Sequence, residues 1–147
     1  MQWLLYAFVI LAGVLDTFQT ATNPALVEKA GQPIVAALLI SLVTFVCAAI
    51  AAPFLGVSTA SVTKATEAPW WSYLGGAFAL VYTLATLYAG AKIGSAAFTG
   101  LAVTAAIVTS VVLDHFGLMG LDTRPAGIHR IAGCSLMIGG VLLVAKF

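Results

Sequence analysis

Charged side chains are scarce in this sequence. Its 147 residues include six Lys and Arg and five Asp and Glu, so 7% are charged, whereas 62% are hydrophobic. Soluble domains carry about 25% charged residues, and a chain with so few cannot cover a surface that faces water. This composition excludes a soluble globular protein, and six scattered cations exclude a nucleic-acid interface.

Residue patterns that carry chemistry are also missing. Cys47 and Cys134 fall inside long apolar stretches and lack the spacing of metal ligands. The sequence has no phosphate-binding glycine-rich loop, no H-E-x-x-H or C-x-x-C pattern and no nucleophile elbow. We therefore expect no enzyme activity, no bound metal and no cofactor.

Long hydrophobic runs are abundant. A helix needs about 20 predominantly apolar residues to cross a hydrocarbon core about 30 Å thick. We predict an all-α integral membrane protein with one five-helix domain over residues 1–147. The first run lacks the basic start of a signal peptide, so we expect it to be retained. The expected spans are about 3–22, 33–55, 70–90, 93–113 and 128–145.

Prolines indicate where these helices begin. Pro33 and Pro69 occupy expected first-turn positions, where the missing N–H is not needed. We expect Pro24 to lie in a connection, and residues 56–68 to form the longest polar linker.

The cations of the connections are balanced. Five spans place the two chain ends on opposite sides of the membrane, so the cations of each side can be compared. Three lie on the side of the N-terminus and three on the other side: Lys64, Arg124 and Arg130 against Lys29, Lys92 and Lys146. A weak bias can still give one orientation. The interpretation that we favour is insertion in both orientations, with an antiparallel homodimer as the product.

Small residues recur at helical spacing in the last two spans. Ala102, Ala106 and Ser110 repeat every fourth residue, as do Ser135 and Gly139. In lipid, small residues let helix backbones approach closely. They indicate either a dimer seam or ordinary packing within one bundle.

Polar side chains gather on one face of the first span. Asp16, Gln19, Thr20 and Asn23 stand at i, i+3, i+4 and i+7, within an arc of about 100°. Asp16 lies about 20 Å beyond Trp3 along a helix. A charge at the centre of a span costs at least ~2.5 kcal/mol, and such residues usually mark an ion or substrate path.

Three interpretations of Asp16 remain open. It binds a solute or coupling ion in a cavity, or it pairs with a cation such as Lys29 or Lys92, or its helix unwinds early and leaves it near the headgroups. Tyr82 and Tyr88 in the third span either line the same cavity or anchor their helix at the interface.

A second polar group joins the fourth and fifth spans. Asp114 ends one helix and Arg130 begins the next, and each has the unfavourable sign for its helix dipole. Pairing them would offset both mismatches and clamp the two helices together. The same residues, with His115, are alternatively a gate.

Three segments resemble the short YdcZ-like branch of the drug/metabolite transporter superfamily. They are residues 69–76 (PWWSYLGG), 113–120 (LDHFGLMG) and 130–133 (RIAG). Gln19 and Asn23 are similar to that branch's helix-one pattern of Gln, three residues, then Asn. The resemblance implies half of an inverted-repeat transporter, completed by an antiparallel copy or a paired homologous subunit, in a bacterial inner membrane.

Two positions depart from that branch. It often carries Gly-Gln where this chain has Ala105 and Ala106, so any contact made by that Gln is lost or moved here. The branch usually has a small or apolar residue at the position of Asp16. In this respect Asp16 is more similar to the membrane carboxylate of four-helix exporters.

Together these features predict a small secondary transporter. We expect a proton- or ion-coupled exporter or antiporter of a small polar or cationic solute that acts as an antiparallel dimer. The alternatives are a flippase subunit for a lipid-linked substrate and a membrane scaffold subunit that transports nothing.

Overall fold

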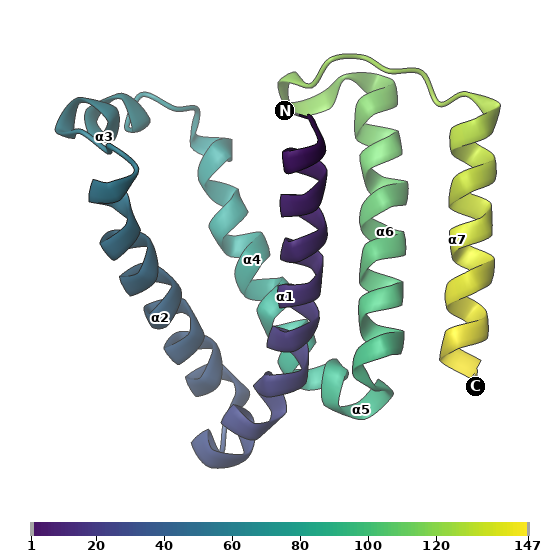
Figure 1. Ribbon diagram of the computed structural model, residues 1–147, viewed down its shortest axis with the longest axis horizontal. Helices are drawn as coiled ribbons and strands as arrows, with labels where there is room; N and C mark the ends of the chain where they lie inside the picture. The colour runs from purple at the N-terminus through teal and green to yellow at the C-terminus, as the bar shows by residue number, and fades with distance from the viewer. Residues whose placement is uncertain (1, 147) are drawn as a thin grey trace. The chain divides into compact units, whose positions relative to one another are not determined.

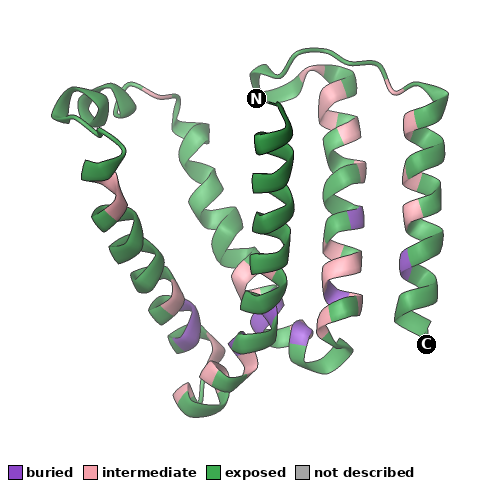
Figure 2. Ribbon diagram, viewed as in Figure 1, coloured by how far each residue is buried: buried purple, intermediate pink, exposed green. Residues whose placement is uncertain are grey.

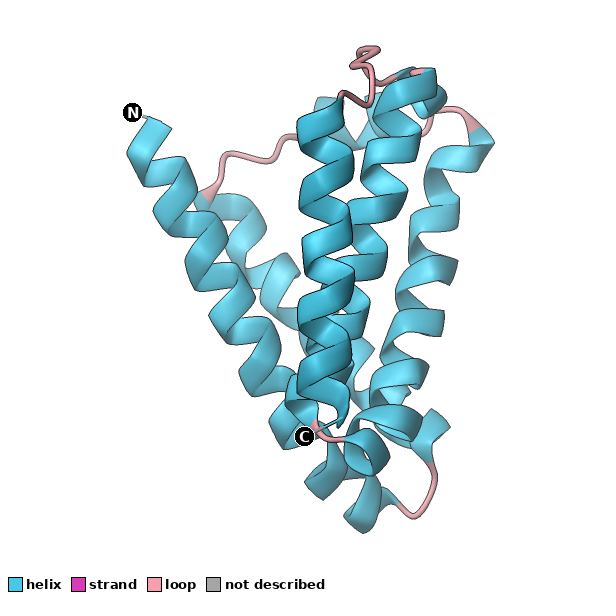
Figure 3. Cartoon of the chain, turned by 90° about the vertical axis from the view of Figure 1, so that its right-hand side faces the viewer, coloured by secondary structure: helices cyan, strands magenta, loops and turns pink. Residues whose placement is uncertain are grey.

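The computed structural model describes residues 2–146, and they are almost entirely helical (Figure 1). No strand occurs in this part of the chain, and loops are confined to short connections (Figure 3). Five helices are long and apolar enough to cross a membrane: Gln2–Ala30, Pro33–Phe54, Trp70–Ile93, Ser95–Phe116 and Ile128–Lys146. The predicted all-α fold of an integral membrane protein with five spans is confirmed.

The third span is composite. A 3-10 turn, η1 (Trp70–Tyr73), leads into α4 (Leu74–Ala85), and a π-helical turn, η2 (Thr86–Gly90), joins α4 to α5 (Ala91–Ile93). The other spans are single helices. One short helix, α3, and one 3-10 turn, η3, lie in the connections. These elements are α1 (Gln2–Ala30), α2 (Pro33–Phe54), α3 (Thr59–Ala65), α6 (Ser95–Phe116), η3 (Leu118–Gly120) and α7 (Ile128–Lys146).

Helix α1 is longer than expected. We placed its end near Thr22 and Pro24 in a connection, but the helix continues through Pro24 to Ala30, so the placement of Pro24 was wrong. An interior proline removes one backbone hydrogen bond, and membrane helices tolerate this because neighbouring groups satisfy the backbone. Leu26 and Val27 lie beyond Pro24 and pack on other helices, which favours continuation of the helix.

The polar linker 56–68 contains the short helix α3. The Ser58 side chain caps it, because the Ser61 N–H donates to Ser58 Oγ at 3.2 Å. The Tyr73 hydroxyl donates to the Ala65 carbonyl oxygen at 2.7 Å and so ties the end of α3 to η1. This connection is therefore folded.

The described chain divides into two compact units. One unit is Gln19–Tyr88, in which α2 packs against α4. Its small core consists of Ala36, Ala37 and Leu87, and side chains from the end of α1 pack on it. The expectation of one domain stays a prediction.

The other unit combines the residues up to Phe18 with those from Ala89 onward. Within it α6 and α7 run side by side (Figure 1). A Cβ added at Gly100 would lie 2.7 Å from Val141 Cγ2, so the two helices approach closely at this glycine. Gly100 thus serves packing within the chain, and the role of the repeated small residues Ala102, Ala106 and Ser110 stays a prediction.

Apolar side chains cover most of the surface. Only five apolar residues are buried in the described chain, namely Ala36, Ala37, Leu87, Phe98 and Val141, and Figure 2 shows the remainder largely exposed. Phe54 is 87% exposed and Leu136 is 77% exposed. Exposed apolar surface of this extent marks contact with a membrane or a partner chain.

Candidate functional site

Asp16 lies at the midpoint of α1. Fourteen residues of the helix precede it and fourteen follow it, and its side chain is partly exposed. At 1.5 Å per residue α1 is about 43 Å long, which is more than the hydrocarbon core of about 30 Å requires. The helix places Asp16 well away from both of its ends.

One earlier interpretation of Asp16 and one of its two suggested partners do not fit this helix, whereas pairing with Lys92 stays a prediction. The helix does not unwind after Asp16, so the interpretation that an early end leaves Asp16 near the headgroups was wrong. Lys29 is on the same continuous helix, thirteen residues further on. That separation is about 20 Å along the axis, beyond the reach of the two side chains within one chain.

The polar face of α1 becomes buried beyond Asp16. Thr20 is 3% exposed and Asn23 is 4% exposed, whereas Gln19 is exposed. Asn23 shares its face with Leu26 and Val27, one turn further on, which pack on the Ala36–Leu87 core. Thr20 and Asn23 therefore sit where α1 enters the packing of its unit, while Gln19 does not.

Asn23 has an unusual position for a polar side chain. It is almost fully buried in a helix whose other residues up to Phe18 are largely exposed. Among residues 2–146 the buried side-chain polar atom without a hydrogen-bond partner is Thr99 Oγ1 on α6, and Asn23 is not of this kind.

A third buried polar residue escaped the sequence analysis. Thr86 is 3% exposed and its hydroxyl donates to the Tyr82 carbonyl oxygen at 2.9 Å. It opens the π-helical turn η2, and its neighbour Leu87 belongs to the same core on which α1 packs. π-Helical turns are rare and often mark functional sites. The residues 86–90 (TLYAG) carry no sequence signal for one.

The two tyrosines of the third span are exposed. Tyr82 is 43% exposed and Tyr88 is 55% exposed. Tyr82 belongs to the same unit as Thr20, Asn23 and Thr86. Its carbonyl oxygen accepts the hydrogen bond from the Thr86 hydroxyl. A role in lining a cavity stays a prediction for both side chains.

The second polar group is assembled as predicted. Arg130 Nη1 lies 3.2 Å from Asp114 Oδ2, so the expected ion pair between α6 and α7 is confirmed. His115 is part of the same structure, because its Nδ1 accepts a hydrogen bond from the Ala126 N–H at 3.1 Å. A role of these residues as a gate stays a prediction.

Residues 2–146 include no group of three or more His, Cys, Asp or Glu side chains arranged to hold a metal ion. Cys47 is exposed and Cys134 is partly buried, and both are free thiols.

Comparison with known proteins identifies the family. Residues 4–143 match the family described as "Putative inner membrane exporter, YdcZ", which covers almost the whole chain. No curated protein and no solved structure matches this chain. With five helices able to cross a bilayer, this places the protein in the inner membrane and in a family of transporters. The chain belongs to the YdcZ family of the drug/metabolite transporters.

Proposed function

We propose that the protein is a small secondary transporter in which Asp16 exchanges a proton or cation for a polar or cationic solute. The position of Asp16 carries this proposal. Any stretch of about 20 residues of α1, the length of one span, includes Asp16 at least five residues from either end. Asp16 therefore lies about 7 Å or more inside the hydrocarbon core for every such placement of an upright helix.

A carboxylate at this depth needs a polar environment. Charge in the middle of a span costs at least ~2.5 kcal/mol, and such residues face a cavity or a partner. Proton and solute then compete for the same carboxylate, and this competition produces exchange without covalent chemistry. A negative site favours a cationic or hydrogen-bonding solute.

The buried polar residues beyond Asp16 suit the same role. Asn23 is buried, and its amide carries both donors and an acceptor. Thr86 donates to a backbone carbonyl, so its hydroxyl oxygen retains acceptor capacity. We propose that Gln19, Thr20, Asn23 and Tyr82 contribute hydrogen bonds along the path of the solute.

We propose an antiparallel homodimer, or a pair with a homologous subunit, as the working assembly. Five spans divide the six cations, which lie at helix ends or between the spans, three to each side of the membrane, and this balance leaves orientation weakly specified. Inverted repeats around a site near the midplane are a common transporter architecture, and a five-helix chain supplies one repeat.

The proposal is tested with purified protein in liposomes that contain a pH-sensitive dye. Addition of the lipophilic cation tetraphenylphosphonium or of a polyamine to wild-type protein is expected to move protons, and Asp16→Asn is expected to abolish this movement. Glu28→Gln is the matched control, because Glu28 is an exposed acid on the same helix. Proton movement that survives Asp16→Asn would exclude Asp16 as the exchange site.

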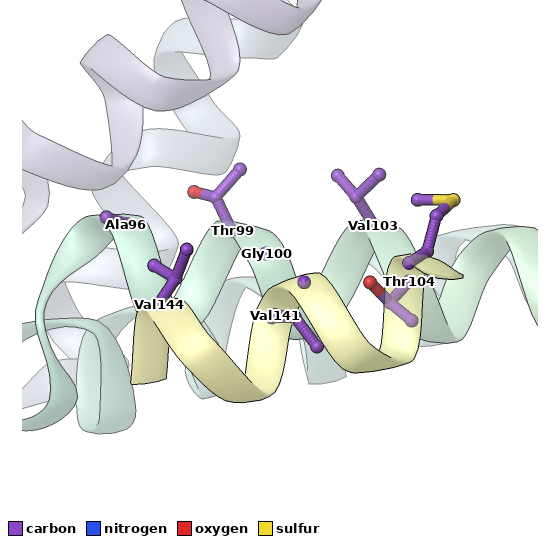
Figure 4. Close-up of a pocket in the computed structure, with 9 residues that line it drawn as sticks. Ala96, Thr99, Gly100, Val103, Thr104, Val141 and Val144 are labelled. Atoms are coloured by element: carbon purple, nitrogen blue, oxygen red, sulfur yellow. The ribbon is translucent and has the colours of Figure 1, made fainter. Parts of the chain in front are cut away.

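A flippase subunit for a lipid-linked substrate is the second candidate, and one observation favours it. Two adjoining grooves of about 420 and 440 Å³ follow the α6–α7 seam and share Met137. The first is largely apolar, and Gly100, Val141 and Val144 are among the residues that line it (Figure 4). The second ends at Asp114 and Arg130. A groove with an apolar course and a charged end suits a lipid chain with a polar head.

Flippase activity predicts movement of a fluorescent polyprenyl phosphate between leaflets by the reconstituted protein, with or without a proton gradient. A scaffold subunit predicts neither proton movement nor lipid movement, and tolerance of Asp16→Leu without loss of assembly. The three functions therefore give different results in the same liposomes.

A further inference from the structure

The connection from α6 to α7 is folded back onto the end of α6. Asp114 is its anchor: its carbonyl oxygen accepts from the Arg124 N–H at 2.7 Å, and its carboxylate pairs with Arg130. The Arg130 guanidinium also lies 3.4 Å from the Arg124 carbonyl oxygen. Helix α6 ends at Phe116, and Gly117 caps it in the left-handed conformation with φ 59°. The connection thus has a defined shape.

One bond of this structure depends on the protonation state of a side chain. The His115 Nδ1 accepts from the backbone N–H of Ala126 at 3.1 Å. A histidine nitrogen accepts only when it carries no proton, so the observed bond requires a neutral ring with its proton on Nε2. In the protonated ring both nitrogens are donors, and Ala126 then loses its acceptor.

We propose that His115 is a proton-sensitive latch for the segment 123–127 that leads into α7. Protonation of His115 releases the Ala126 end of the connection, while the Asp114–Arg130 ion pair continues to hold the start of α7. The device loosens the entry to α7 without separating α6 from α7. It does not depend on the transport activity proposed above.

The surroundings of His115 limit its alternatives. Its ring packs edge-on against Phe116, with ring centroids 4.8 Å apart. The charged and titratable residues of the elements that meet here are Asp114 on α6, Asp122 and Arg124 in the connection, and His129 and Arg130 in the first turn of α7. The carboxylate of Asp114 pairs with Arg130 through Oδ2.

Nitrogen NMR of the wild-type protein, labelled with ¹⁵N-histidine and reconstituted in nanodiscs, tests the resting state. The two ring nitrogens of each tautomer have distinct chemical shifts. At about pH 8 the proposal predicts the Nε2–H form for His115. A His115 ring with its proton on Nδ1 would overturn the proposal, and this measurement needs no variant other than one for assignment.

Amide hydrogen exchange tests the release. When the pH falls from about 8 to about 5, the protection factor of the Ala126 amide is expected to decrease about tenfold, after correction for the intrinsic effect of pH on exchange. A tenfold decrease corresponds to the loss of about one hydrogen bond. His115→Asn keeps an acceptor oxygen near the Nδ1 position but cannot titrate, so it is expected to hold protection at both pH values. His129→Asn, the control, is expected to retain the wild-type pH response. An equal pH response in His115→Asn and wild-type protein would refute the latch.

Discussion

A single methyl group at Gly100 should separate α6 from α7. A Cβ at this position would lie 2.7 Å from Val141 Cγ2, and the side chain of Val141 is 7% exposed. Branched Val has few alternative rotamers in a helix, so it cannot move aside without strain. We therefore expect Gly100→Ala to overpack the α6–α7 seam.

The magnitude follows from comparison with a glycine that has space. Gly139 on α7 has nothing within 4 Å of an added Cβ. Both Gly→Ala changes gain the same helix propensity, about 1 kcal/mol, whereas only Gly100→Ala incurs overpacking, typically about 1–3 kcal/mol. The two variants should thus differ by about 1–3 kcal/mol in free energy of unfolding.

The assay is unfolding by SDS in mixed micelles, followed by circular dichroism, with the oligomeric state of each variant checked by size-exclusion chromatography. Val141→Ala removes the obstructing methyl groups, so Gly100→Ala should be less harmful in that background. A double-mutant cycle measures this recovery. Equal stability of Gly100→Ala and Gly139→Ala, or absence of coupling to Val141, would refute the close approach of the two helices.

Two further predictions concern the α6–α7 connection and use the same unfolding assay. Asp114→Asn and Arg130→Gln should each lower the free energy of unfolding. A double-mutant cycle should show a coupling energy of about 0.5–1 kcal/mol between them, because the ion pair is partly exposed. Strictly additive effects would mean that the ion pair contributes nothing to stability. Gly117→Ala should lower the free energy of unfolding by about 1–2 kcal/mol because Gly117 has a φ of 59°. The clash of the added Cβ, which would lie 2.6 Å from Thr123 Oγ1, should lower it further. Thr123→Ala should remove only the loss due to this clash, and full recovery would contradict the backbone argument.

The helices themselves were readable from the sequence because hydrophobic length alone decides which segments cross a bilayer. The Asp114–Arg130 pair was also predictable, since two unfavourable helix-end charges meet when α6 and α7 are adjacent. Both inferences need only one-dimensional information about position along a helix.

Other features depend on packing and were missed for that reason. Pro24 is a helix breaker by local preference, but side chains beyond it pack on α2 and η2 and favour continuation. The burial of Asn23 and Thr86 also requires knowledge of which helix faces meet. The acceptor role of His115 depends on the return path of the 117–127 segment, which no periodicity encodes.

The folded connections have a practical consequence for experiments on orientation. On the side of the N-terminus trypsin has few usable sites: Lys64 lies inside α3, Arg124 precedes Pro125, and Arg130 is in the first turn of α7. Proteases need extended, accessible chain, and trypsin cuts poorly before proline. Protein that survives trypsin in sealed vesicles can therefore still expose this face, so the orientation is better measured by labelling an introduced cysteine.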